Sequence, residues 1–141
     1  MKAIALDLGT KTVGVALSDP SGFLASPLVT LRFESEDYDD ALNQVEDLLN
    51  QNLVDVIILG FPKNMDGTVG YSGERSLFFK EEMEQFTQIP IVLWDERLTS
   101  VAAHEILHSN NQKQKKHKAV VDQVAAVQML QEYLDAQKVK K

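Results

Sequence analysis

The strongest constraint on the fold is a change of pattern after residue 32. Up to that point the chain contains strand-like segments joined by short turns, at residues 2–8, 12–18 and 23–32. Turns of about three to five residues join neighbouring antiparallel strands. Beyond residue 32, segments with apolar residues at helical spacing alternate with short apolar runs, which are typical of buried parallel strands. The pattern therefore predicts a three-stranded meander followed by alternating helices and strands.

The alternating part defines the rest of the architecture. The expected helices span residues 38–52, 74–88, 99–108 and 119–134, and the expected strands span residues 54–59 and 89–94. Crossovers between parallel strands place helices on both faces of a sheet. We expect an α/β fold with a mixed five-stranded sheet, three antiparallel strands followed by two parallel ones. A chain of 141 residues fits one domain, 1–141.

Charge is unevenly distributed along the chain. The net charge of −7 divides into −11 over residues 1–109 and +4 over residues 110–141. The basic residues gather in segment 110–118, before the last expected helix, and in a short tail at 135–141. An acidic body argues against loose binding of nucleic acid, but a basic region is compatible with a directional phosphate-binding edge. A solubilising tail is the alternative interpretation.

Composition also bears on the cellular compartment. The chain has no cysteine, which excludes disulfides and thiolate metal sites and suits a reducing compartment. The longest uncharged run, residues 20–31, is shorter than the roughly 20 apolar residues that a membrane span needs. Asp7 interrupts the apolar stretch that a signal peptide would require. We therefore expect a cytoplasmic protein with no membrane partner.

Residues that directly follow apolar strands are expected at one edge of the sheet. They are Asp7, the segment 60–62 and the segment 95–97, and ligands collect beyond the carboxyl ends of such strands. A carboxylate within an apolar strand, such as Asp7, is costly without a partner. The turn at 9–11 brings backbone N–H groups that can approach phosphate or a hydrated metal. Alternatively, Asp7 simply satisfies that turn.

Two further carboxylate positions are candidates. Asp95 and Glu96 point to opposite faces of their strand, so one of them faces the site. Arg97 can neutralise either or hold a phosphate in bidentate fashion, although the three residues can also form a salt-bridged strand exit. Asp122 has apolar neighbours near the start of the last helix, where it can also favour the helix dipole.

Convergence of these acids would create a cation site. Three crowded carboxylates raise one another's pKa unless cations lie between them. Oxygen-only ligands select Mg²⁺ or Mn²⁺. Two such ions about 4 Å apart can clamp a phosphodiester and activate water.

Four motifs in order resemble one known family. They are ALDLGTKTVGVALSD at 5–19, GFP with DGTVG at 60–70, DERLTS at 95–100, and Asp122 with Ala125-Ala126. Together they cover about residues 2–134 and resemble the YqgF family of pre-16S rRNA nucleases, formerly called Holliday-junction resolvases.

This resemblance implies a ribonuclease H-like fold related to the RuvC resolvases. It also implies hydrolysis of phosphodiester bonds with Mg²⁺ or Mn²⁺, and a role in maturing small-subunit ribosomal RNA. Asp7, Glu96 and Asp122 match the expected acidic triad, with Asp95 as the alternative to Glu96. The implied partner is structured RNA, with branched DNA as the alternative, and the chain can act as a monomer or a homodimer.

One departure from the family concerns substrate contacts. The family commonly has Lys-Arg where this chain has Lys11-Thr12, so one expected phosphate contact is missing at that turn. The remaining candidates for substrate binding are Lys11, Thr12, Arg97, Lys115, Lys116 and Lys118. The three lysines of the 115–118 cluster can equally form a solvated entry to the last helix.

Three other functions compete with a nuclease. His104 and His108 match the H-E-x-x-H pattern of zinc peptidases, but the pattern is short, and nothing else supports Glu132 as the third ligand. Asp-x-Gly-Thr at residues 7–10 also opens the phosphate-binding strands of actin-like and sugar-kinase ATPases, which use two such domains. A non-catalytic nucleic-acid-binding module would not need all three acids, and this chain has them.

Overall fold

The computed structural model describes residues 1–64, 66–95 and 114–139, with side chains of the last range from Gln123 to Lys138. Its elements are β1 (Ala3–Leu8), β2 (Thr12–Ser18), β3 (Ala25–Arg32), α1 (Tyr38–Gln51), β4 (Val56–Phe61), α2 (Tyr71–Met83), β5 (Ile91–Asp95) and α4 (Gln114–Val139). The expected helix at 99–108 and its two histidines lie outside the described residues.

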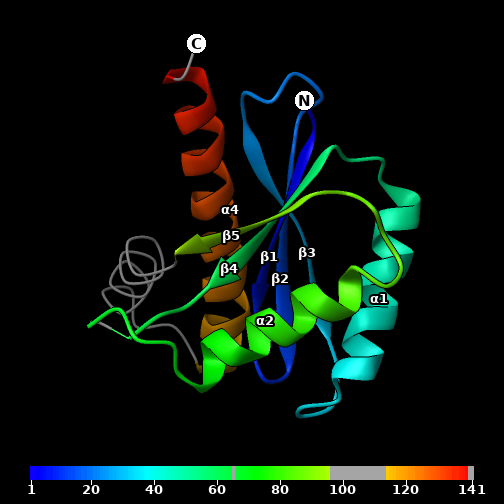
Figure 1. Ribbon diagram of the computed structural model, residues 1–141, viewed down its shortest axis with the longest axis vertical. Coiled ribbons are helices and arrows are strands. Elements are labelled where there is room, and N and C mark those ends of the chain that lie inside the picture. Colours follow the sequence, from blue (N-terminus) through cyan, green and yellow to red (C-terminus); the bar gives the residue numbers. More distant parts are fainter. Residues whose placement is uncertain (65, 96–113, 140–141) are drawn as a thin grey trace.

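The five strands form one mixed sheet in the order β3-β2-β1-β4-β5. β1 pairs antiparallel with β2, and β2 pairs antiparallel with β3. β1 pairs parallel with β4, and β4 pairs parallel with β5. Helices α1 and α2 cover one face and α4 covers the other (Figure 1). The expected α/β architecture is confirmed.

β1 is the central strand, and its six residues are all buried. Alternate side chains enter different cores, because successive residues of a strand point to opposite faces. Ile4 and Leu6 pack in the core under α1 and α2. Ala3 and Ala5 pack in the core under α4, and their small side chains allow the helix to lie close to the sheet.

Some element boundaries differ from those expected. α4 begins at Gln114 rather than at residue 119, so Lys115, Lys116 and Lys118 lie within the helix and not before it. The sequence Gln-Lys-Lys-His-Lys has no apolar periodicity, but lysine and glutamine are good helix formers. α2 spans Tyr71–Met83 rather than 74–88.

The end of α2 has a simple cause. The amides of Phe86 and Thr87 both donate to the carbonyl of Met83, at 3.0 Å, in a tight turn that ends the helix. Phe86 nevertheless packs against the core beside α1 and α2, which explains why its spacing resembled a continuing helix. None of the described helices is long and apolar enough to cross a lipid bilayer.

Candidate active site

Asp7 is a buried carboxylate near the carboxyl end of β1, with 7% of its surface exposed. It follows Ala3 and Ala5 at two-residue spacing, and both of those side chains pack under α4. Strand alternation therefore turns Asp7 toward the α4 face of the sheet. A carboxylate in this position is costly unless polar groups or cations compensate it.

Asp7 belongs to a row of three residues that crosses the sheet. Its Cα partner on β2 is Gly14, and the Cα partner of Gly14 on β3 is Thr30. Neighbouring strands lie about 4.8 Å apart, so Thr30 and Asp7 are separated by about 10 Å. Gly14 contributes no side chain between them, which leaves Asp7 and Thr30 as the polar side chains of the row.

Helix α4 passes over this row, and the segment of the helix that lies there contains Asp122. The side-chain Nε2 of Gln123 donates to the hydroxyl oxygen of Thr30 at 2.6 Å. Asp122 is the preceding residue, so its Cα lies about 3.8 Å from that of Gln123. Its side chain lies outside the described atoms. The backbone thus brings residue 122 to the face of the sheet on which Asp7 lies.

Asp95 ends β5 and lies on the other face. Val92 and Trp94 pack against the α4 core, and the Trp94 ring meets that of Tyr133 on α4 at 5.9 Å between centroids. Leu93 packs in the opposite core. Alternation gives Asp95 the face of Leu93, opposite to that of Asp7. Glu96 and Arg97 lie outside the described residues.

The end of β1 that carries Asp7 lies at a switch in strand order. From β1 the chain continues to β2 and β3 on one side of the sheet, and later to β4 and β5 on the other. Open α/β sheets bind ligands beyond the carboxyl ends of the strands at such a point. The N-terminal half of α4 lies at this same end of the sheet, the lower end in Figure 1. Within the described residues, no three acidic, histidine or cysteine side chains group closely enough to hold a metal.

The turn between β1 and β2 is held by backbone hydrogen bonds. The amide of Gly9 donates to the carbonyl of Thr12 at 2.7 Å, and the amides of Phe33 and Glu36 donate to Lys11 and Thr10 at 3.0 and 2.9 Å. Thr12 is buried, whereas the Lys11 side chain is exposed. Lys11 is thus free to contact an anion at this edge, while the backbone that carries it is fixed.

The loop after β4 is organised by its own side chains. Asp66 accepts hydrogen bonds from the amide and the hydroxyl of Thr68, at 2.9 and 2.6 Å. These bonds lower the pKa of Asp66 below its ordinary value. The Lys63 ammonium lies 5.5 Å from the centre of the Phe61 ring. The Asp66 carboxylate is therefore used within the loop, and Lys63 adds a cation beside the carboxyl end of β4.

Known proteins place the chain in a family. Residues 1–136 match the family model described as RuvX, Holliday junction resolvase. The chain belongs to this family. It is 47% identical over 136 residues to a "Putative pre-16S rRNA nuclease" of Bacillus licheniformis, covering 96% of this chain and 98% of that protein. A protein of the same name from Bacillus subtilis is 46% identical, covering 96% and 99%. The resemblance to the YqgF family is thus confirmed.

A solved structure extends the likeness to the fold. RuvC of Thermus thermophilus, in complex with its Holliday junction substrate, matches with a TM-score of 0.61 and 11% identity, covering 98% of this chain and 96% of that one. The expected relation to the RuvC fold is confirmed at the level of architecture.

Arg75 is a residue near the carboxyl end of β1 that the sequence did not point out, and it extends from α2, on the face of the sheet opposite to that of Asp7. Its Nη2 donates to the carbonyl oxygen of Leu8 at 3.3 Å. Leu8 is the next residue after Asp7, so the guanidinium lies at the switch in strand order. The buried positions of α2 include Gly73, Ser76 and Phe79. An arginine next to these positions in the sequence is the pattern that would have indicated Arg75.

Proposed function

We propose that this RuvX-family chain is a divalent-metal-dependent nuclease that hydrolyses phosphodiester bonds in structured nucleic acid, as a single domain over residues 1–141. One observation carries the proposal: Asp7, a buried carboxylate, lies at the carboxyl end of the central strand and faces the helix that contains Asp122. The names of the two Bacillus relatives support precursor 16S rRNA as the substrate.

The donor set suits Mg²⁺ or Mn²⁺. Asp7, Glu96 and Asp122 are the residues that would hold the cation, and they offer oxygen atoms alone. A cation beside Asp7 would stabilise its carboxylate further, because charges interact more strongly at a site removed from water. When bound, the cation would supply an activated water and stabilise the charge that develops on the phosphate. Asp95 is the weaker candidate, since it shares the face of Leu93.

The chain's own cations would orient the substrate. Lys11 is exposed on the rigid turn beside Asp7, where it can contact a phosphate oxygen, with Thr12 next to it. Arg97 would neutralise or hold a second phosphate. The lysines at 115, 116 and 118 lie on the first turns of α4, at the same end of the sheet. On an otherwise acidic body, this arrangement would admit a phosphate backbone from one direction.

Branched DNA is the second candidate substrate. The family model carries the description Holliday junction resolvase, and the fold is that of RuvC. RNA and DNA can share such a site, because it recognises backbone geometry as much as bases. A nuclease of precursor ribosomal RNA acts where that RNA is made, so the proposal also places the chain in the bacterial cytoplasm.

The experiment is a cleavage assay on precursor 16S rRNA and on a four-way DNA junction, each with and without Mn²⁺. We expect Mn²⁺-dependent cleavage of the RNA that is lost in Asp7→Asn. Asp55→Asn is the matched control, because Asp55 accepts a hydrogen bond from the Lys2 amide at 2.9 Å, at the opposite end of β1. Equal cleavage by Asp7→Asn and the parent would refute the proposal. Cleavage of the junction alone would transfer the activity to DNA.

A further inference from the structure

The hydrogen bond between Gln123 and Thr30 joins α4 to the row that contains Asp7. It is 2.6 Å long and links two partly buried side chains that are 93 positions apart in the chain. Thr30 lies in register with Gly14, and Gly14 with Asp7. One side chain of α4 is therefore tied to the same row of the sheet as the buried carboxylate, and the tied residue directly follows Asp122.

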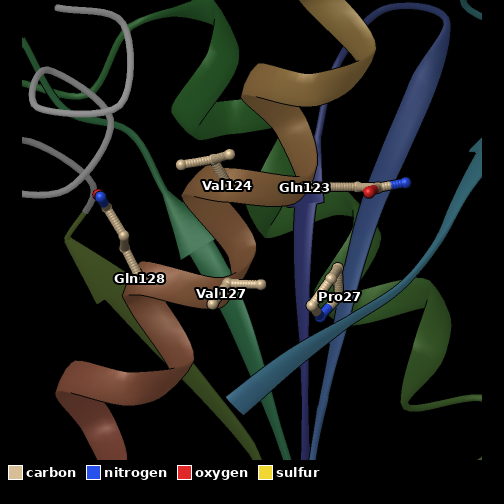
Figure 2. A pocket seen from close by; sticks show the side chains of 5 residues that line it. All are labelled: Pro27, Gln123, Val124, Val127 and Gln128. Carbon is tan, nitrogen blue, oxygen red and sulfur yellow. The ribbon is translucent and has the colours of Figure 1, made fainter. Parts of the chain in front are cut away.

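A groove lies beside this bond. The groove, of about 370 Å³, runs between α4 and β3 and is lined by Pro27, Gln123, Val124, Val127 and Gln128 (Figure 2). In Figure 2 Gln123 extends toward the strands on the side of Pro27, whereas Gln128 extends to the other side of the helix. The Gln123 side chain thus lines the groove and reaches β3 beside it.

Buried apolar side chains run along α4 from Ala125 onward. Ala125 and Ala126 are at most 2% exposed, and Met129, Leu130 and Leu134 are each at most 1% exposed and pack against the sheet. Close packing of this kind limits how far a helix can move. The bond from Gln123 to Thr30 adds a polar contact to this packing, one residue away from Asp122.

We propose that Gln123 is a positioning residue, whose hydrogen bond to Thr30 holds Asp122 at the row that contains Asp7. The inference rests on the proposed function, since it takes Asp7 and Asp122 as ligands of one divalent cation. Gln123 itself is not a ligand in this scheme. It fixes the helix backbone that carries the ligand Asp122. In known metal sites, residues that do not touch the metal orient the ligands in a comparable way.

Gln131 provides a matched control on the same helix. Its side chain accepts from the Ala25 amide and donates to the Phe23 carbonyl, both at 2.9 Å. These bonds also tie α4 to the start of β3, but two helical turns away from residue 123 and toward the far end of the sheet. Loss of the Gln131 bonds should loosen α4 without moving Asp122.

The test measures the Mn²⁺ dissociation constant of the full chain, from the electron paramagnetic resonance signal of free Mn²⁺. Gln123→Met removes the donor and keeps an unbranched side chain that suits the apolar groove. Thr30→Val removes the acceptor and keeps the branched shape that strands favour. We expect each to weaken Mn²⁺ binding about five- to tenfold, and the double variant to be no weaker than either. Gln131→Met should bind within about twofold of the parent.

Activity provides a second measurement. Cleavage by Gln123→Met should fall at limiting Mn²⁺ and recover at saturating Mn²⁺, with KM for the RNA unchanged. Parental Mn²⁺ affinity in Gln123→Met and Thr30→Val would overturn the inference, as would an equal loss in Gln131→Met, which would indicate general loosening. Failure of the proposed function is distinguishable, because then Asp7→Asn would itself retain Mn²⁺ binding and cleavage.

Discussion

The Arg75 guanidinium reaches across from α2 to the carbonyl oxygen of Leu8, with Nη2 3.3 Å from that oxygen. The bond lies at the end of β1, one residue beyond Asp7, at the switch in strand order. The Nε atom of Arg75 is buried, and no hydrogen-bond partner for it is found among the described residues. Arg75 thus holds the end of the strand that carries the candidate ligand, and it places a positive charge on the α2 side of that strand end.

Replacement of Arg75 should affect both stability and substrate binding. Arg75→Met keeps the apolar stem but removes the donor to Leu8, which should lower the free energy of unfolding by about 1 kcal/mol. Loss of the charge should raise KM for the RNA more than it lowers kcat. Urea denaturation and steady-state cleavage check these two effects.

Lys80 on the same helix gives the control for charge. Its ammonium pairs with Glu84 at 3.0 Å on the exposed surface, and exposed pairs of this kind contribute about 0–1 kcal/mol. Lys80→Met should leave KM unchanged. An equal rise of KM in both variants would mean that RNA binding depends on the total charge of the chain and not on the position of Arg75.

The two faces of β5 predict which neighbouring acid binds the cation. Asp95 shares the face of Leu93, away from Asp7, and this makes Glu96 the favoured ligand of the two. Glu96→Gln should weaken Mn²⁺ binding at least about tenfold, whereas Asp95→Asn should stay within about threefold of the parent. Calorimetric titration with Mn²⁺ measures both, and the reverse order would make Asp95 the ligand.

Residue patterns predicted the elements of the sheet, because these elements depend on local periodicity. The sequence also placed Asp7 at the carboxyl edge of the sheet. That Asp7 faces α4 follows only from the structure, in which Ala3 and Ala5 of the same strand pack under that helix. The edge shared by Asp7 and the segment 60–62 followed equally from the direction of parallel strands.

The contacts of Arg75 and Gln123 could not be predicted in this way. Arg75 reaches Leu8 across 67 positions of the chain and Gln123 reaches Thr30 across 93. Such contacts depend on the exact position of one packed element relative to another, and no local sequence pattern specifies that position. The early start of α4 at Gln114 was missed for a different reason, because its first turn is helical by propensity alone and has no apolar periodicity.

Gly73 is required by the close approach of α2 to the loop after β4. A Cβ at this position would lie 2.8 Å from the Pro62 carbonyl oxygen and 2.7 Å from a methyl of Val69. Gly73→Ala should therefore lower the free energy of unfolding by about 1–3 kcal/mol and displace the loop beside the site. Thermal unfolding and cleavage rate measure the two effects.

Gly70 is the matched control for this substitution. A Cβ there would meet Asn64 Oδ1 at 3.3 Å, the end of an exposed side chain. Gly70→Ala should cost less than about 1 kcal/mol, since the neighbour can move. A larger loss in Gly70→Ala than in Gly73→Ala would show that the approach of α2 to Pro62 does not limit the loop.

The turn between β2 and β3 should make stability depend on pH at the acidic end. Hydrogen bonds from Leu24, Ser21 and Phe23 to the Asp19 carboxylate lower the pKa of Asp19 from 3.8 to about 2. Because the folded pKa lies below the unfolded one, the stabilisation is complete above about pH 4 and disappears as pH falls through 2. Asp19→Asn should be less stable than the parent at pH 7, and the difference should shrink between pH 4 and pH 2. Urea denaturation of both proteins across this range tests the prediction, which fails if the difference is the same at every pH.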